Sequence, residues 1–454
     1  MAHLFITTRP LPALAESARL RYATFVLMYF SQGIPEGLLI LAVPAWLAMN
    51  GKSPAVIAGY AAVALLPASL KILLAPMIER FTYLPMGRRR PWLLIGQEGL
   101  ILSFVGVLLV PDPLNHVSLL AAAVACLLTF EIIQDVATDS LVIDIVPVAE
   151  QGRANSLMWG AKAVGRAVAL AGGSWLIQRY GLATAVLVGS ATVAPVLLAP
   201  LLLRERPGEK LLPWLAGATS PAAARMRVEG WGGLWRAVRR VFVLRNSLLM
   251  ATTLFLGGLG LDYVLTGLPI FTIQGLGWSS VQHSQVYSLA GLTGGVLGML
   301  VGGPLIAWLG TVRLVQLALL AQAGLVAGLG LLPGLWPQAG FVMGFIGCFC
   351  LMSVLMQIGL LALAMHCCWQ RISALQFTLY MTIINSGSTV GSMLLGYART
   401  HYGWQATLLA FPLLPLAVVG VLQLMRMPVH TQQLTALESA HQEEAETLAL
   451  RLAV

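Results

Sequence analysis

The most constraining feature of this sequence is a series of long apolar runs that recur from one end of the chain to the other. Twelve such runs are recognised, at 22–48, 54–78, 91–110, 117–145, 154–178, 181–203, 247–273, 284–308, 313–333, 339–365, 373–397 and 404–425. Each has about the 20 residues or more that a helix needs to cross a hydrocarbon core of about 30 Å. None has the alternating segments of about 10 residues that are typical of a membrane β-barrel. The runs therefore predict an all-α membrane protein with twelve transmembrane helices.

The composition supports a membrane protein and argues against nucleic acid as a partner. Only 10% of the residues are charged and 58% are hydrophobic, whereas soluble chains carry about 25% charged and 45–50% apolar residues. The net charge of +9 would fit a nucleic-acid-binding surface, but the basic residues are concentrated on one predicted side of the membrane. Only Lys52, Arg179 and Arg399 fall on the opposite side. This positive-inside pattern predicts a bacterial inner-membrane protein with both termini in the cytoplasm.

A basic segment divides the helices into two sets of six. We expect an N-terminal six-helix bundle at 1–203, a basic cytoplasmic linker at 204–245, a C-terminal six-helix bundle at 246–425 and a cytoplasmic tail at 426–454. A shift of 226 residues (262 − 36) superposes Glu36 on Asp262 and Gly51 on Gly277. Weak symmetry of this kind is typical of transporters built from two related bundles.

The linker itself has two open interpretations. Between Trp231 and Phe242 its apolar residues recur at helical spacing, with arginines between them. This pattern fits an amphipathic helix on the inner leaflet, and it also fits a solvated basic connection.

Charged residues inside the predicted helices point to the functional site. Glu131, Asp135 and Asp139 are spaced four residues apart and share one helix face, and Lys162 and Arg166 have the same spacing on the next helix. A rise of about 1.5 Å per residue brings the two sets to matching depth. We therefore predict that Arg166 lies between Glu131 and Asp135, and Lys162 between Asp135 and Asp139.

Charges at the bilayer centre cost about 2.5–3.5 kcal/mol each and are expected to be paired or to face a water-filled cavity. They could serve only to hold the two helices together. The convergence of several acids favours a role in transport instead. Glu36 has no cation in its own helix and is the first candidate for proton coupling. The other candidates are Asp135, Glu131 and Asp262. The candidates for substrate binding are Lys162, Arg166, Gln134 and Asn385.

The run at 373–397 is polar instead of charged. Asn385, Ser386, Ser388, Thr389 and Ser392 are interspersed with Gly387 and Gly391. They could line a cavity as hydrogen-bonding groups, or they could allow close helix packing.

The sequence lacks the motifs of several other protein classes. It contains no P-loop, no GxGxxG, no HExxH and no GxSxG. The adjacent His366, Cys367 and Cys368 would point apart on a helix and do not have the spacing of a metal site. A membrane sensor would need a soluble output domain, and a membrane enzyme would need a nucleophile or a metal. We therefore predict a monomeric secondary transporter, not an enzyme, without cofactor or metal, whose partners are a small-molecule substrate, protons and the lipid bilayer.

Four short motifs carry a family resemblance. Residues 75–80 (APMIER) and 87–92 (GRRRPW) resemble the loop motif of the major facilitator superfamily. Gln134-Asp135-x-x-x-Asp139 and the segment 373–377 (SALQF) resemble signatures of its AmpG-type muropeptide permeases. The resemblance implies import of N-acetylglucosaminyl-anhydromuramyl peptides driven by the proton-motive force. Siderophore permeases of the pyochelin and rhizobactin type belong to the same branch and are the alternative substrate class.

The loop motif also implies a cytoplasmic gate between the bundles. An acid at Glu79 would favour the positive N-terminal end of a nearby helix, for which we expect the helix at 373–397. Arg80 is expected to pair with Asp139 or Asp144. The predicted gate residues are Glu79, Arg80, Asp139, Asp144 and Arg153.

Overall fold

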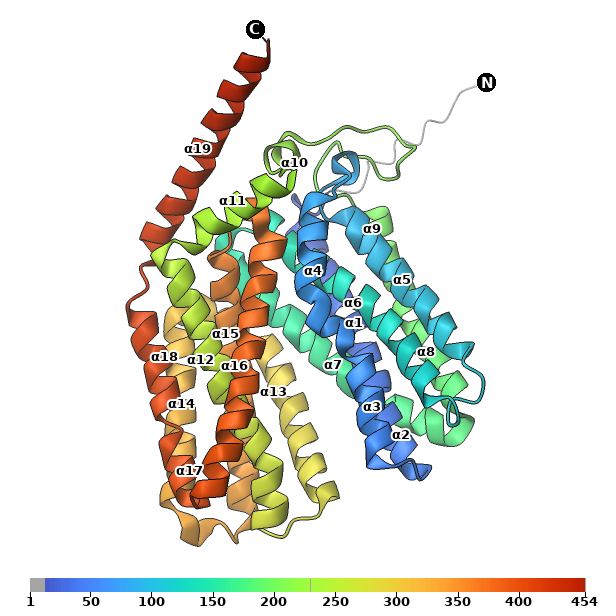
Figure 1. Ribbon diagram of the computed structural model, residues 1–454, viewed down its shortest axis with the longest axis vertical. Helices are drawn as coiled ribbons and strands as arrows, with labels where there is room; N and C mark the ends of the chain where they lie inside the picture. Colours follow the sequence, from blue (N-terminus) through green and yellow to red (C-terminus); the bar gives the residue numbers. More distant parts are fainter. Residues whose placement is uncertain (1–12, 229, 454) are drawn as a thin grey trace.

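The computed structural model describes residues 13–228 and 230–453, and these ranges contain helices and no strand. The membrane helices of the first half are α1 (Ala18–Pro35) continued by η1 (Glu36–Ala42) and α2 (Val43–Met49); α3 (Pro54–Ala64) with α4 (Leu66–Arg80); α5 (Arg90–Leu108); α6 (Val117–Ile145); α7 (Val148–Tyr180); and α8 (Leu182–Val193) with η3 (Ala194–Leu197) and α9 (Leu198–Leu202). Figure 1 shows them as one bundle.

The membrane helices of the second half form the other bundle (Figure 1). They are α12 (Arg245–Pro269) with η4 (Ile270–Gly275); α13 (Ser280–Leu309); α14 (Thr311–Leu331); α15 (Ala339–His366); α16 (Ser373–His401); and α17 (Trp404–Ala410) with α18 (Leu413–Gln423). The short connecting helices are η2 (Leu84–Met86), α10 (Pro221–Arg225), α11 (Gly230–Phe242), η5 (Pro333–Leu335) and η6 (Gln370–Ile372).

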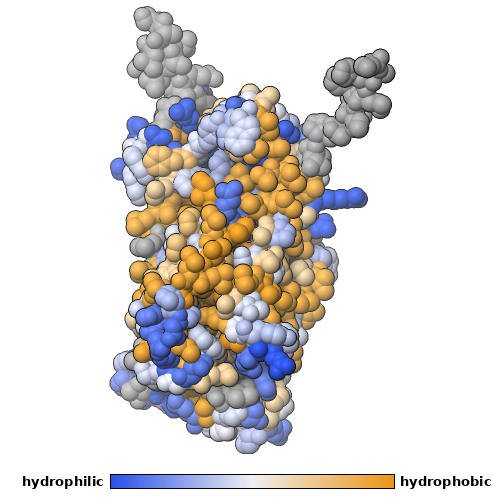
Figure 2. Space-filling model, turned by 90° about the vertical axis from the view of Figure 1, so that its right-hand side faces the viewer, coloured by the Kyte–Doolittle hydropathy of each residue, from blue (hydrophilic) through white to orange (hydrophobic). Residues whose placement is uncertain are grey.

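The predicted all-α membrane fold is confirmed. Of the twelve predicted membrane helices, ten are assigned by their length and apolar composition and two by their position in the bundles. Within the described residues, ten segments are long and apolar enough to cross a membrane. The remaining two helices, α7 and α16, have 33 and 29 residues but carry many polar side chains. Both lie inside the bundles beside the apolar helices. Figure 2 shows the corresponding apolar belt between two hydrophilic ends.

One end of the molecule carries the linker, and we call it the linker face. It holds α10, α11 and the start of a long terminal helix, α19 (Met427–Ala453), which projects away from the bundles (Figure 1). The segment 230–242 is a helix and not an extended solvated connection. Its buried residues Leu234, Ala237 and Val241 pack with side chains of α4 and η6, while Trp231 and Trp235 remain exposed. The apolar stripe of α11 therefore docks largely on the protein.

Glycine allows two matching close helix crossings, one in each bundle. A Cβ atom at Gly33 or Gly37 of the first helix would come within 2.4 Å or 2.2 Å of a backbone oxygen of α7. A Cβ at Gly387 or Gly391 of α16 would likewise come within 2.0 Å or 2.1 Å of a backbone oxygen of α12. Small residues let membrane helices approach to backbone contact. For the glycines of α16, close packing is therefore the interpretation that the structure supports.

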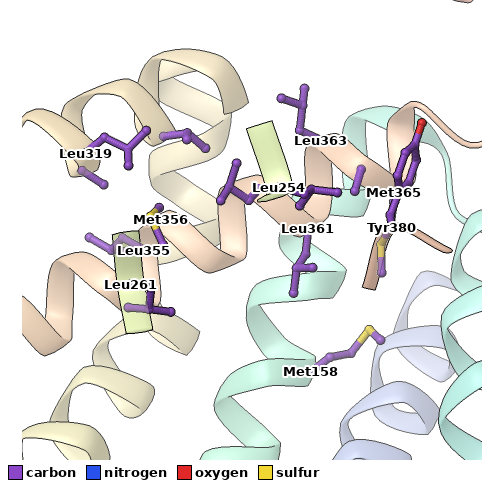
Figure 3. Close-up of a cluster of buried hydrophobic side chains, with 14 of the residues drawn as sticks. Met158, Leu254, Leu261, Leu319, Leu355, Met356, Leu361, Leu363, Met365 and Tyr380 are labelled. Carbon is purple, nitrogen blue, oxygen red and sulfur yellow. The ribbon is translucent and has the colours of Figure 1, made fainter. Parts of the chain in front are cut away.

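A buried apolar cluster joins the two bundles. Figure 3 shows Met158 of α7 beside side chains of the second bundle, among them Leu361 of α15. Along the same stretch, Gly160 and Ala163 of α7 lie against Met299 and Gly295 of α13. Asn155 of α7 also donates a hydrogen bond to the carbonyl oxygen of Ile358 (2.7 Å). The half of α7 that starts at the linker face therefore forms the contact between the bundles.

Candidate functional site

Four charged side chains meet in the interior of the first bundle. The Lys162 ammonium lies 2.8 Å from a carboxylate oxygen of Glu36 and 3.8 Å from one of Glu131. The Arg166 guanidinium lies 2.5 Å from the other oxygen of Glu36. Two cations and two acids thus form one charge-balanced group, which we call the central cluster. Its members come from η1, α6 and α7.

The close crossing of the first helix with α7 creates this cluster. Gly33 and Gly37 bring the backbones together on either side of Glu36, so the Glu36 carboxylate meets Lys162 and Arg166 directly. Glu36 also begins η1, a π-helical segment that follows Pro35. Such π segments are frequent at functional sites. In the second bundle η4 likewise follows Pro269, so this local irregularity occurs in both halves.

The predicted pairing of α6 with α7 is wrong in its partners. Arg166 does not lie between Glu131 and Asp135, and Lys162 reaches Glu36 and Glu131 instead of Asp139. Asp135 pairs with Lys71 of α4 at 2.5 Å. The reason is that α7 packs along the first helix and touches α6 much less. Glu36 consequently has two close cations, contrary to the expectation that it lacks one.

Lys71 is a residue for which the sequence analysis offered no role. Its side chain is half-buried in α4, and its only signal in the sequence is that it is a third cation within an apolar run. The Lys71–Asp135 pair lies close to the central cluster. Asp139 belongs neither to this pair nor to the central cluster. It accepts a hydrogen bond from Tyr29 of the first helix.

Gln134 is buried and satisfied by protein groups. Its amide is hydrogen-bonded to Gln32 (2.7 Å), Gln97 (3.1 Å) and Ser31 (3.2 Å). No atom of Gln134 is among the lining of the cavity described next, as far as the described residues show. The predicted role of Gln134 in substrate binding is therefore not supported, because its hydrogen-bonding capacity is used in helix packing.

A cavity of about 270 Å³ opens beside the central cluster. Arg166, whose side chain is 42% exposed, and the two acids of the cluster form its charged part. Aliphatic side chains of η1, α4 and α6, and of Leu65 between α3 and α4, form the rest. The lining residues are Glu36, Ile40, Leu41, Leu65, Ala68, Leu128, Glu131, Ile132 and Arg166.

Two predicted residues of the second bundle lie outside this cavity. Asn385 of α16 is exposed and Asp262 of α12 is half-buried. Tyr287 of α13 lies within electrostatic range of both Asp262 of its own bundle and Arg166 of the first bundle. The structure therefore brings Glu36, Glu131, Lys162 and Arg166 together, and leaves Asp262 and Asn385 outside this group.

A second charged group fastens the bundles together at the linker face. Arg88 forms ion pairs with Glu79 of α4 and with Asp144 of α6, and Arg89 lies 2.8 Å from Glu79 and 3.0 Å from Asp144. These four side chains are fully buried. Arg88 also donates to the carbonyl oxygens of Gln370 (2.6 Å) and Arg371. The hydroxyl of Ser373, the first residue of α16, donates a hydrogen bond to Asp144 (2.8 Å) and accepts one from Arg89 (2.8 Å).

Two residues of the predicted gate, Glu79 and Asp144, thus lie at the start of α16, but they pair with arginines other than those expected. Arg80 lies over the ring of its neighbour Phe81 at 5.8 Å, and Asp144 is paired by Arg88 and Arg89 instead. Arg153 lies over the ring of Tyr22 at 5.2 Å and packs against Gly303 of α13. The loop that follows Arg80 turns back towards α4, so that Arg88 and Arg89 lie beside Glu79. The spacing of these residues in the sequence did not indicate this arrangement.

The linker folds back onto this gate. The Glu205 carboxylate accepts the backbone N–H groups of Arg88 (2.9 Å), Arg89 (2.5 Å) and Arg90, and so caps the start of α5. Gly87 has φ +102°, and a Cβ there would lie 2.6 Å from the Glu205 carboxyl carbon. Glycine is therefore required at position 87 both for its backbone conformation and for the approach of Glu205.

The nearby Glu209 is a titratable group of this face that lies outside the membrane helices. Its carboxylate accepts from Ser220 (2.8 Å) and from the backbone N–H of Arg206 (3.0 Å). Burial and then the charge of Glu205 raise the pKa of Glu209 from 4.5 to about 7, against the opposing effect of these two hydrogen bonds. Glu209 therefore titrates in the physiological range.

Comparison with known families identifies the fold. The family model of the Major Facilitator Superfamily matches residues 25–368. The chain belongs to the major facilitator superfamily. As a member of this superfamily it is a multi-pass membrane transporter that moves small-molecule substrates. Among the described residues, no group of three or more His, Cys, Asp or Glu side chains could hold a metal ion.

Individual relatives of this major facilitator protein agree with the assignment. It is 24% identical to the anhydromuropeptide permease of Escherichia coli K12 over 386 residues, which cover 85% of this chain and 75% of the permease. An uncharacterised protein of Haemophilus influenzae is 30% identical over 128 residues, 28% of this chain and 30% of that protein.

Solved structures show the same fold at lower identity. The fucose:proton symporter of Escherichia coli matches with a TM-score of 0.62 at 11% identity, covering 89% of this chain and 98% of the symporter. The human organic anion transporter MFSD10 gives 0.61 at 16% identity, covering 89% of this chain and 99% of that transporter.

Proposed function

We propose that this transporter imports anhydromuropeptides by proton symport across a bacterial inner membrane. The observation that carries the proposal is the cavity beside the central cluster, in which a partly exposed guanidinium and two carboxylates meet inside the membrane. The resemblance of the chain to an anhydromuropeptide permease over 85% of its length supports this substrate. Such a substrate carries a peptide and can present a carboxylate to Arg166.

The central cluster also offers a way to couple transport to protons. Glu36 is held by two cations within 2.8 Å, whereas Glu131 has one cation at 3.8 Å. Burial disfavours the charged form of a carboxyl group that lacks a close partner. Glu131 is therefore the better candidate for the proton carrier, and Glu36 is better placed to hold Lys162 and Arg166 in position.

Alternating access would then proceed through the gate. The buried ion pairs of Arg88 and Arg89 and the contact between α7 and α13 close the linker face in this structure. The positive-inside pattern supports a cytoplasmic position for that face. Release of the substrate into the cytoplasm would require these contacts to separate, while the site stays between the bundles.

Uptake by membrane vesicles tests the proposal. Vesicles with the wild-type protein are expected to accumulate labelled anhydromuropeptide when a proton gradient is imposed, and to stop when a protonophore is added. Glu131→Gln is expected to abolish accumulation against a gradient but to retain exchange of labelled for unlabelled substrate. Absence of any anhydromuropeptide uptake by the wild type would overturn the proposal.

The aliphatic lining of the cavity favours one second candidate. A siderophore with an aryl group and a carboxylate would also match apolar walls next to Arg166. Gradient-driven uptake of such a ferric siderophore, without uptake of anhydromuropeptide, would assign the protein to this class.

A further inference from the structure

We propose that the cavity is a subsite for a carboxylate attached to a compact apolar group, and that sugar rings of the substrate bind outside it. The proposal rests on the proposed function in one respect, namely that this cavity belongs to the transport pathway. It goes further by stating which part of the substrate the cavity accepts.

The walls of the cavity favour an apolar group over a sugar as its occupant. Six of its nine lining residues are aliphatic, and the other three are charged. Among the described residues, no amide, hydroxyl or aromatic side chain contributes to the lining. Sugar hydroxyls need hydrogen-bond partners when they leave water, and each one left unpaired weakens binding. Aliphatic walls instead favour burial of methyl, branched aliphatic or aryl groups.

The size of the cavity sets the size of the group. Its volume is about 270 Å³, and an apolar protein cavity of about 150 Å³ is large enough to take benzene. The cavity can therefore hold a branched aliphatic or aryl group together with the carboxylate that it carries. Leu128 and Ile132 of α6 flank Glu131 in sequence, so the apolar wall and the charged end belong to the same stretch of helix.

The charges of the central cluster select an anion together with a proton. Glu36 and Glu131 balance Lys162 and Arg166, so an added carboxylate would leave an uncompensated negative charge. Protonation of Glu131 removes one negative charge, and a bound carboxylate then restores neutrality beside Arg166. The proton and the carboxylate should therefore each strengthen the binding of the other.

The surroundings of Glu131 do not supply a competing excess charge. On its own helix Asp135 is paired with Lys71 of α4 at 2.5 Å, and Asp139 accepts from Tyr29 of α1. The charges that act on Glu131 are those of Glu36, Lys162, Asp135 and Arg166, and the charge of Asp135 is countered by Lys71. Across the bundle contact, Tyr287 of α13 and Asp262 of α12 face the side of Arg166.

Binding of a matched series of small probes to the full-length protein in lipid nanodiscs tests the proposal. The probes are N-acetylglycine, N-acetylalanine, N-acetylleucine and N-acetylphenylalanine, with N-acetylleucine amide and N-acetylglucosamine as comparisons. Affinity is expected to rise about fourfold for each buried methylene. The leucine and phenylalanine probes separate an aliphatic from an aryl preference, which corresponds to a peptide or a siderophore source. N-acetylglucosamine is expected to bind more weakly than N-acetylleucine.

The pH dependence of probe binding and the effects of substitutions at two positions test the carboxylate site and the apolar wall separately. The affinity for N-acetylleucine should rise by up to about tenfold per unit fall in pH while Glu131 titrates, and that for its amide should not change. Arg166→Gln should abolish the preference for acid over amide. Leu128→Ala, or Ile132→Ala if the first variant does not fold, should flatten the dependence on side-chain size. Leu102→Ala, at a 69% exposed position of α5, is the matched control and should leave both intact.

Several outcomes would overturn the inference without touching the proposed function. These are equal affinities along the series, an amide that binds as tightly as the acid, or an affinity for N-acetylglucosamine above that for N-acetylleucine. If the probes bind as expected but vesicles take up no anhydromuropeptide, the proposed substrate fails and the carboxylate subsite stands.

Discussion

At the scale of single residues, the function of a charge in this protein depends on which partner it reaches. The sequence around Arg166 does not indicate whether its partner is Glu36 or Asp135. In the structure Arg166 pairs with Glu36, and this pairing places it at the cavity. Removing one member of a buried ion pair costs about 3–5 kcal/mol, whereas replacing both members can be nearly neutral. The pairing can therefore be tested by comparing single and double variants.

For Arg166→Gln we expect lower abundance in the membrane and loss of uptake. The effect on abundance should be smaller than for a fully buried pair, since the Arg166 side chain is 42% exposed. Arg166→Gln combined with Glu36→Gln should recover abundance but not uptake, because the charge is balanced while the substrate contact is still missing. Arg166→Gln combined with Asp135→Asn is the matched control and should not recover abundance, since Asp135 pairs with Lys71. Recovery of uptake in the first double variant would show that the cluster is only structural.

At the scale of elements, the loop between α4 and α5 and the start of α16 form the fastening between the bundles. Arg88 contacts two acids of the first bundle and two carbonyl oxygens of the second. Its removal should therefore open the linker face, while removal of Arg80, which lies over Phe81, should not.

We expect Arg88→Ala to increase the labelling of a cysteine placed at Gln370 by a membrane-impermeant maleimide by at least about tenfold, and to slow uptake. The labelling should be measured in a background without the native cysteines. Arg80→Ala is the control and should give nearly wild-type labelling. Equal labelling of the two variants would contradict the assignment of Arg88 to the gate.

The linker provides a prediction that concerns pH. A pKa of Glu209 of about 7 in the folded linker, compared with 4.5, means that the folded form binds the proton more tightly than the unfolded form. This contribution to stability is therefore complete below about pH 4.5 and is lost as the pH rises towards 7. Its upper limit is about 3 kcal/mol.

Hydrogen exchange of the segment 204–220 measures this effect. In the wild type, exchange is expected to be slower at pH 5.5 than at pH 8 after correction for the intrinsic rate. Glu209→Gln should remove most of that difference, because its amide does not titrate in this range. A wild-type segment whose corrected exchange does not change with pH would show that Glu209 is not the controlling group.

At the scale of the whole molecule, the two bundles meet along α7 and α13, and transport requires this contact to change. A Cβ at Gly302 of α13 would lie 3.1 Å from the Cβ of Ser156 of α7, close to the separation of about 3.5–4.5 Å in a disulfide. In a cysteine-free background, Ser156→Cys combined with Gly302→Cys should lose uptake on oxidation and regain it with a reductant. Gly302→Cys alone is the control and should not respond to oxidation. Uptake by the oxidised double variant would show that this contact does not move.

The sequence by itself determined which segments cross the membrane and which family the chain resembles. Apolar length sets these features locally, so the predicted run at 117–145 coincides with α6, Val117–Ile145. Intramembrane charge also marked Glu36, Glu131, Lys162 and Arg166 as candidates for the site, because such residues are too costly to retain without partners.

Only the tertiary structure decided which of these residues meet. The depth argument brought the acids of α6 and the cations of α7 to the same part of the bundle, but it could not show that the first helix, through Gly33 and Gly37, packs on α7 and puts Glu36 in reach of both cations. It likewise could not pair Asp135 with Lys71, or direct Arg88 and Arg89 to the start of α16. Depth depends on position along one helix, whereas ion pairing depends on how neighbouring helices are rotated and crossed, and that is fixed by side-chain packing over the whole bundle.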